Sequence, residues 1–115
     1  MTTYRTDPAG LLQLAADLAV SDPKVQARAA RALLKEARLR DAVSLVQASL
    51  QIADQEILAG RFDGDRVQLE SLRPIGAVPS RLRELAVSPD PGVGRVAAGA
   101  VKRFDQRVQV DHGAV

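Results

Sequence analysis

Five basic residues in the first half of the chain recur at the spacing of one helix face. They are Lys24, Arg28, Arg31, Lys35 and Arg38, which follow one another at intervals of four, three, four and three residues. On a helix, which turns by about 100° per residue, these positions fall within about 40° of one line along the axis. Lysine and arginine side chains bind phosphates and carboxylates, and arginine contacts either group with two parallel hydrogen bonds. The spacing therefore predicts a basic ridge, about 21 Å long, that binds an anionic surface.

The charge of the chain is unevenly distributed around this basic ridge. Residues 24–40 contain six basic residues and one acidic residue, a net charge of +5, whereas residues 41–72 contain two basic and six acidic residues, a net charge of −4. Residues 1–23 carry −2 and residues 73–115 carry +3, which completes the +2 of the whole chain. Two interpretations stay open: the ridge binds an external anion, or it is a solvated helix face whose cations pair with acids of residues 41–72.

The aromatic content limits which anionic partners fit. The chain has one tyrosine, two phenylalanines and no tryptophan, too few for a platform on which single-stranded bases stack. No aromatic residue is expected on the face opposite the ridge, which disfavours a membrane-surface role. If the partner is nucleic acid, we therefore expect contact with the backbone of a duplex, and we expect Arg95, Lys102 and Arg103 to contribute further basic contacts.

No group of residues in the sequence has the spacing of a catalytic or metal site. The absence of cysteine excludes thiol catalysis, iron–sulfur clusters and thiolate zinc sites. The single histidine, His112, falls in the expected C-terminal tail, where a general base would be poorly positioned. Asp63, Asp65 and Glu70 lack the ligand spacing of a calcium loop and suit a turn with a helix cap instead. We therefore predict no enzyme activity, no metal, no cofactor and no small-molecule substrate.

The residues around the ridge are strong helix formers, with 19 alanines, 14 leucines and 13 valines in the chain. Capping residues, prolines and apolar periodicity predict four helices, at residues 8–20, 65–72, 80–87 and 90–108. Residues 74–79 are expected to be a linker. Between Pro23 and Gly60 the chain has neither proline nor glycine, which predicts one long helix or two helices kinked near residues 40–41.

An apolar stripe runs along the second half of that central segment. Its members are Val43, Val46, Leu50, Ala53 and Ile57. The spacing is that of a coiled-coil seam, which could pair within the chain or between copies, and it equally suits an ordinary bundle helix. Because a core of small residues buries little area per residue, a bound partner or self-association would add needed stability.

Two segments of the chain can be aligned with one another. Residues 18–25 read Leu-Ala-Val-Ser-Asp-Pro-Lys-Val, and residues 85–93 read Leu-Ala-Val-Ser-Pro-Asp-Pro-Gly-Val. An alanine-rich helix is expected after each, so both segments predict a helix–turn–helix unit. Over residues 11–33 and 79–104 the pattern resembles HEAT-type and leucine-rich-variant helical repeats. The resemblance implies stacked helical hairpins and a binding function, directed at proteins in most members of such families and at nucleic acid in some.

Together these features predict one all-α domain over residues 1–115, a small bundle of five or six helices with HEAT-like hairpins and a frayed tail at 109–115. No apolar run approaches the roughly 20 residues of a membrane span, and residues 1–10 lack a secretory signal, so we expect a cytoplasmic location and no membrane partner. The leading hypothesis is a non-enzymatic binding or scaffold protein that engages a protein partner, or a second copy of itself, through helix surfaces. The alternative is a nucleic-acid-binding accessory or regulatory protein that places residues 24–40 on a duplex backbone.

Overall fold

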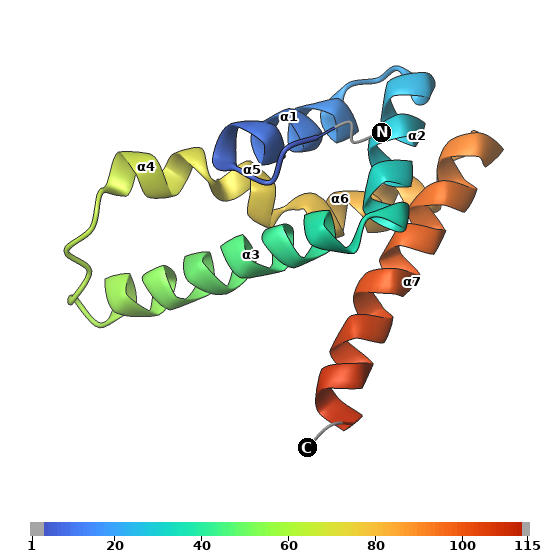
Figure 1. Cartoon of the computed structure of the whole chain (residues 1–115). Coiled ribbons are helices and arrows are strands. Elements are labelled where there is room, and N and C mark those ends of the chain that lie inside the picture. Colours follow the sequence, from blue (N-terminus) through green and yellow to red (C-terminus); the bar gives the residue numbers. More distant parts are fainter. Residues whose placement is uncertain (1–3, 114–115) are drawn as a thin grey trace.

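The structure, a computed structural model, describes the backbone of residues 4–113 and the side chains of residues 4–106. This part of the chain is all-helical and contains no strand (Figure 1). In chain order the helices are α1 (Pro8–Ala19), α2 (Pro23–Lys35), α3 (Ala37–Leu58), α4 (Arg66–Ser71), α5 (Arg73–Gly76), α6 (Val78–Ala86) and α7 (Pro91–Gly113). The predicted all-α bundle is confirmed, whereas the predicted count of five or six helices is wrong for the described residues.

Four helices begin where the sequence predicts, each after an aspartate that caps it. The carboxylates of Asp7, Asp22, Asp65 and Asp90 accept hydrogen bonds from backbone N–H groups of the following turn, at 2.9–3.2 Å. These bonds satisfy donors that the helix itself leaves unpaired. After three of the four aspartates the next residue is proline, whose fixed φ suits the first helical turn.

The central segment forms two helices, and the break lies at Glu36, a few residues before the expected kink. Glu36 has extended backbone angles, φ −111° and ψ 101°. The guanidinium of Arg40 donates hydrogen bonds to the carbonyl oxygens of Leu33 and Leu34, at 2.7 and 2.9 Å. Arg40 thereby caps the C-terminal end of α2 from within α3, which compensates for the interrupted helix.

The expected linker at residues 74–79 is also wrong, because it is mostly helical. α5 and α6 occupy this region, and Pro74 and Pro79 each lie in the first turn of their helix. A proline in the first turn removes a donor that would have no partner there, so it does not interrupt the helix. α5 is the helix that raises the count to seven.

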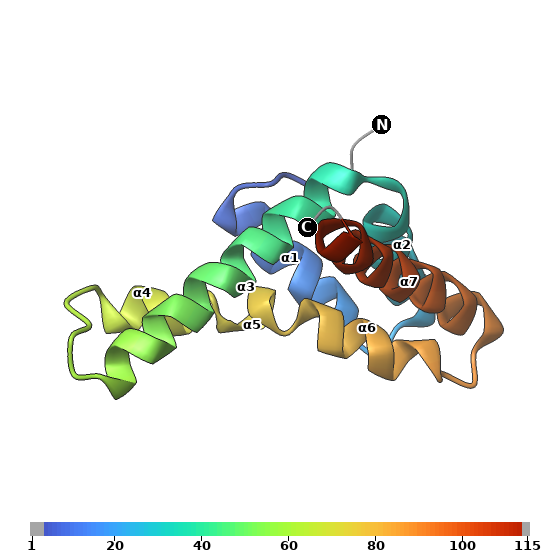
Figure 2. The ribbon, with the colours of Figure 1, turned by 90° about the horizontal axis from the view of Figure 1, so that it is seen from below.

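The main core lies between α1, α2, α5, α6 and α7 and the first half of α3. Its largest fully buried side chains are Leu11, Leu14, Leu18, Leu33, Leu39, Val43, Ile75, Val78, Leu82 and Val93. α2 and α7 pack closely side by side (Figures 1 and 2). At Gly99 of α7 a side chain would meet the Leu34 methyl of α2 at 3.1 Å, so this glycine permits the close approach of the two helices.

The second half of α3 and the short helix α4 form an arm that extends away from the main core (Figures 1 and 2). A small separate cluster holds the arm together, with Leu50, Ala53 and Leu69 buried at its centre. The loop that joins α3 to α4 within the arm turns at Gly60, whose φ of +72° favours glycine. The predicted apolar stripe of α3 thus packs within its own chain, as the bundle interpretation expects.

The two aligned segments both form helical hairpins, α1–α2 and α6–α7. α1 packs on α6, and α2 packs on α7. Their identification as HEAT-type repeats stays a prediction. The frayed tail expected at residues 109–115 also stays a prediction, because the side chains of these residues and the last two backbone positions lie outside the described part.

Candidate anion-binding surface on α2 and α7

α2 presents four of the five predicted ridge cations on its outer face. Lys24, Arg28, Arg31 and Lys35 are all exposed, while the reverse face of the helix is completely buried at Leu33. From residue 24 to residue 35 the row of cations is about 16 Å long at 1.5 Å per residue. The basic ridge therefore exists as a helix face, but it is one helical turn shorter than the spacing predicts.

Arg38, the fifth predicted cation, does not belong to this row. The break at Glu36 places Arg38 at the start of α3, where its guanidinium forms an ion pair with Glu36 at 2.7 Å and donates to the Tyr4 carbonyl oxygen at 3.0 Å. These contacts tie the N-terminal segment to the α2–α3 junction. The prediction that residue 38 continues the ridge is wrong because the helix that would carry it ends at Lys35.

Arg28 belongs to the row but is engaged in an internal network. The buried Tyr4 hydroxyl donates to Asp17 Oδ2 at 2.5 Å, Gln13 Nε2 donates to Asp17 Oδ1 at 2.9 Å, and Arg28 lies 3.6 Å from the same carboxylate. Burial and the bond to Asp17 raise the pKa of Tyr4 to about 12. The Tyr4 oxygen, and to a lesser extent Asp17, raise the pKa of the Arg28 guanidinium. The charge of Arg28 is thus partly compensated within the protein.

α7, which packs against α2, carries three more cations. Arg95, Lys102 and Arg103 are exposed on α7, which lies alongside α2 in both views (Figures 1 and 2). Arg95 and Arg31, from the two different helices, line one open hollow of about 360 Å³. The sequence predicts both arginines as basic contacts but gives no signal that they share a hollow, because their proximity depends on the packing of α2 against α7.

Six of these cations have no side-chain partner among the described residues. Lys24, Arg31 and Lys35 of α2 and Arg95, Lys102 and Arg103 of α7 form what we call the α2–α7 basic surface. No ion pair or side-chain hydrogen bond joins any of them to another residue whose side chain the structure describes. Of the other described lysines and arginines, only the exposed Arg66 of α4 shares this state.

The acids of residues 41–72 do not neutralise the basic ridge, which argues against the internal-pairing interpretation. Asp54 forms a two-bond ion pair with Arg73, at 2.7 and 2.9 Å, and Glu70 contacts the same guanidinium at 3.3 Å. Glu56 pairs with Arg61 at 3.5 Å. Pairing with Arg73 lowers the pKa of Asp54. Among the described residues, these acids find their partners within the arm and at its base.

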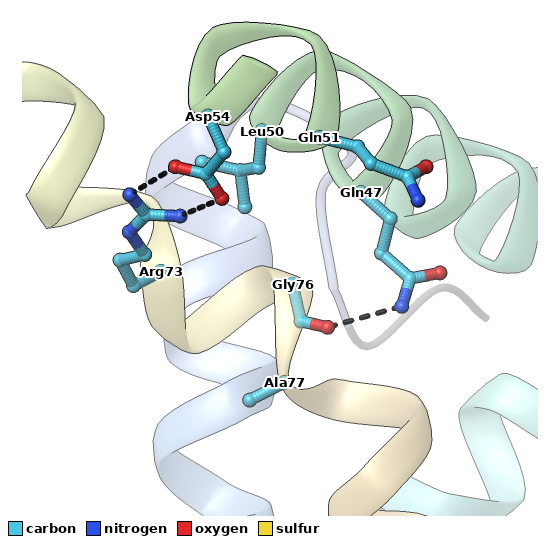
Figure 3. A pocket seen from close by; sticks show the side chains of 7 residues that line it. All are labelled: Gln47, Leu50, Gln51, Asp54, Arg73, Gly76 and Ala77. Atoms are coloured by element: carbon cyan, nitrogen blue, oxygen red, sulfur yellow. Dashed lines mark hydrogen bonds and ion pairs between the residues drawn. The ribbon is translucent and has the colours of Figure 1, made fainter. Parts of the chain in front are cut away.

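A second hollow, of about 450 Å³, lies between α3 and α5 and contains the Asp54–Arg73 pair (Figure 3). On its other side Gln47 Nε2 donates to the Gly76 carbonyl oxygen at 3.1 Å. The two charged groups of this hollow thus bind one another, the Gln47 amide binds the backbone of α5, and both contacts link α3 to α5. A third hollow, of about 260 Å³, lies between α1 and α6 and is largely apolar. Neither brings together an acid–base or nucleophile–base pair aimed at a common point.

The outer face of α3 carries exposed apolar side chains that the sequence reasoning missed. Leu45 and Ile52 are 70% and 60% exposed and lie seven residues apart, so they share one side of the helix. This side is turned away from the buried stripe that contains Val43 and Leu50. The seven-residue spacing of Leu45 and Ile52 is a signal that could have revealed this face.

The described residues contain neither a metal-binding cluster nor a membrane-spanning helix. No three histidine, aspartate or glutamate side chains in this part of the chain are placed to hold a metal ion. None of its helices is long and apolar enough to cross a bilayer. No protein-family model, curated protein or solved structure matches the chain.

Proposed function

We propose that this chain is a non-enzymatic binding protein that docks its α2–α7 basic surface on the phosphate backbone of duplex nucleic acid. The observation that carries the proposal is a set of six cations, on two adjacent helices, that have no side-chain partner in the described part of the chain. Elsewhere in the described part of the chain almost every arginine has an acid or a carbonyl oxygen within reach. The uncompensated charge is therefore concentrated on one surface.

Concentrated positive charge of this kind attracts a polyanion because binding releases the counterions condensed on the phosphates. α2 contributes no acid to the surface, and Asp105 of α7 is held by Arg83 at 3.3 Å. The aromatic side chains Tyr4 and Phe104 are buried, so they offer no stacking face to unpaired bases. These features favour contact with a duplex backbone over readout of single-stranded bases, and such a role suits a cytoplasmic protein.

Binding to a short duplex of mixed sequence, followed by fluorescence anisotropy at several salt concentrations, tests the proposal. Neutralising three surface cations, in the variant R31Q/K35Q/K102Q, removes three of six phosphate contacts. We expect the slope of log K against log salt to change from about −5 to about −3, because each contact contributes about 0.9. The matched control is R66Q, which removes an exposed, unpaired cation on α4 and leaves the slope unchanged.

A change of slope in R66Q of about one third of that in the triple variant, one charge against three, would show that net charge alone drives binding and would refute the assignment to this surface. Absence of duplex binding by the wild-type protein at low salt would refute the proposed function as a whole. Because all four substituted side chains are exposed, we expect each variant to fold. Far-ultraviolet circular dichroism checks this.

A second function, association with a protein partner or with another copy of the chain, is favoured by the outer face of α3. Leu45 and Ile52 are exposed there at the spacing of a helix–helix seam. If this face mediates self-association, light scattering across a concentration series shows a dimer that L45S/I52S converts to a monomer. V67S, which changes an exposed valine of α4, is the control. A monomer at all concentrations would eliminate the self-association version.

A further inference from the structure

The hollow shared by α2 and α7 is the place on the basic surface where two arginines approach one volume. Arg31 enters from the middle of α2, and Arg95 enters from the second turn of α7. Pro91, Gly92 and Val96 complete the lining, and the space is about 360 Å³. This is the lower end of the range typical of small-ligand sites, and it is ample for one phosphate group with part of a sugar.

No acid lines this hollow. The closest acid along α7 is Asp90, whose Oδ1 accepts the backbone N–H groups of Gly92 and Val93 at 2.9 and 3.2 Å. Asp90 is thus engaged as the cap of α7. Neither Arg31 nor Arg95 has an ion-pair or hydrogen-bond partner among the described side chains.

Two guanidinium groups beside one volume repel each other, because arginine stays charged at all physiological pH values. An anion bound between the two guanidinium groups attracts both of them and so replaces the repulsion with a net attraction. A tetrahedral phosphate suits the position, since its oxygens accept paired hydrogen bonds from two forks at once. Pro91 and Val96 supply an apolar wall against which a ribose or deoxyribose can pack.

We propose that the Arg31–Arg95 hollow is a phosphate-binding site, in which both guanidinium groups clamp a single phosphate. The source of that phosphate is the nucleic-acid backbone, and in this respect the inference rests on the proposed function. The two arginines of the clamp fix the position of one phosphate on the surface, whereas the lysines and Arg103 supply general electrostatic attraction.

The variant R31K/R95K tests the clamp because it keeps every charge and removes only the paired hydrogen-bond geometry. General electrostatic attraction predicts no change in duplex affinity, whereas the clamp predicts a loss of about tenfold at fixed salt, the factor for one charge-assisted hydrogen bond. The matched control is R66K, which makes the same substitution at the exposed Arg66 of α4, outside the α2–α7 basic surface, and leaves the affinity unchanged. Titration with inorganic phosphate provides a second readout, in which the Nε–H resonances of Arg31 and Arg95 shift and saturate while that of Arg66 does not.

The outcomes separate the inference from the proposed function. Duplex affinity that is unchanged in R31K/R95K, together with phosphate-insensitive resonances of the two arginines, would overturn the clamp and leave duplex binding by the wider surface intact. Saturable phosphate shifts in a protein that binds no duplex would uphold the clamp, refute the nucleic-acid source and identify free phosphate or a small phosphorylated molecule as the ligand. A tenfold loss in R31K/R95K but not in R66K, with the resonances of both Arg31 and Arg95 shifting, supports the clamp and the nucleic-acid source together.

Discussion

Replacement of Tyr4 by phenylalanine removes one hydroxyl from the network that fastens the N-terminal segment to α1 and α2. Tyr4 is 4% exposed, and its hydroxyl donates to Asp17, which is 9% exposed. In Tyr4→Phe, Asp17 keeps Gln13 and Arg28 as partners but loses its shortest hydrogen bond. A hydrogen bond to a charged group contributes about 1.5–3 kcal/mol, so we expect a destabilisation of about 2 kcal/mol. For a domain of this size that lowers Tm by about 8 °C.

The same residue makes the stability depend on alkaline pH, with a sign that follows from its raised pKa. Tyr4 titrates near 12 in the folded protein and near 10 in the unfolded chain. Because the unfolded state releases its proton first, stability is intact below about pH 10 and is lost as the pH rises toward 12. At about pH 11 the expected loss is about 1.4 kcal/mol, the equivalent of one pKa unit.

Urea denaturation at about pH 8 and pH 11 measures this loss, and Tyr4→Phe provides the control because phenylalanine does not titrate. The wild-type protein should lose about 1.4 kcal/mol more than the variant between the two pH values. Tyr4 is the single tyrosine of the chain, so the ultraviolet absorbance of tyrosinate reports its ionisation directly. An ordinary tyrosine titration, or the same pH dependence in both proteins, would refute the description of the network.

Three further substitutions test other parts of the fold by chemical denaturation. Leu33→Ala opens a cavity at a fully buried position of α2, and we expect a loss of about 2–5 kcal/mol, enough to unfold a marginal domain. Gly60→Ala places a side chain at φ +72° and should cost about 1–2 kcal/mol; an unchanged stability would contradict the left-handed turn. Asp54→Asn removes the ion pair with Arg73. Because this pair lowers the pKa of Asp54, it contributes stability that is present near neutral pH and is lost below about pH 4. The stability of the variant should therefore be less sensitive to acid than that of the wild type in that range.

Local signals in the sequence account for most helix boundaries. Asp7, Asp22, Asp65 and Asp90 were predictable as caps because a short carboxylate next to a helix start satisfies free backbone donors whatever the rest of the fold does. Gly60 was predictable as a stop for a similar reason, since its φ is accessible to glycine at little cost. The inward positions of the helices followed from apolar periodicity in the same way.

The sequence allows two helices in the central segment, but the position of the break at Glu36 was not predictable from it. Residue 36 has no special backbone chemistry, and the carbonyls freed at the end of α2 are satisfied by Arg40, a residue type found all along this segment. The missed helix α5 is a different kind of error. The sequence predicts a linker at residues 74–79, although Pro74 occupies the first turn of α5 and a first-turn proline is the same signal that correctly starts α1, α2 and α7.

The part of the candidate site that lies on α2 was predictable from the sequence, but the part that depends on helix packing was not. Helical spacing placed Lys24, Arg31 and Lys35 on one face of α2, and the structure shows them there. The hollow exists because α7 packs beside α2 and brings Arg95 to the same hollow as Arg31. Such tertiary proximity has no local sequence signature.

The salt dependence of duplex binding by the unmodified protein tests the central claim most directly. Six cations that pair with none of the described side chains predict a slope of about −5, which corresponds to a roughly thousandfold loss of affinity between about 50 and 200 mM salt. A measured slope near −5 that falls when Lys24, Lys35 or Lys102 is neutralised would establish the α2–α7 basic surface as the binding face. Affinity that is independent of salt, or no binding at the lowest salt concentration, would contradict the account.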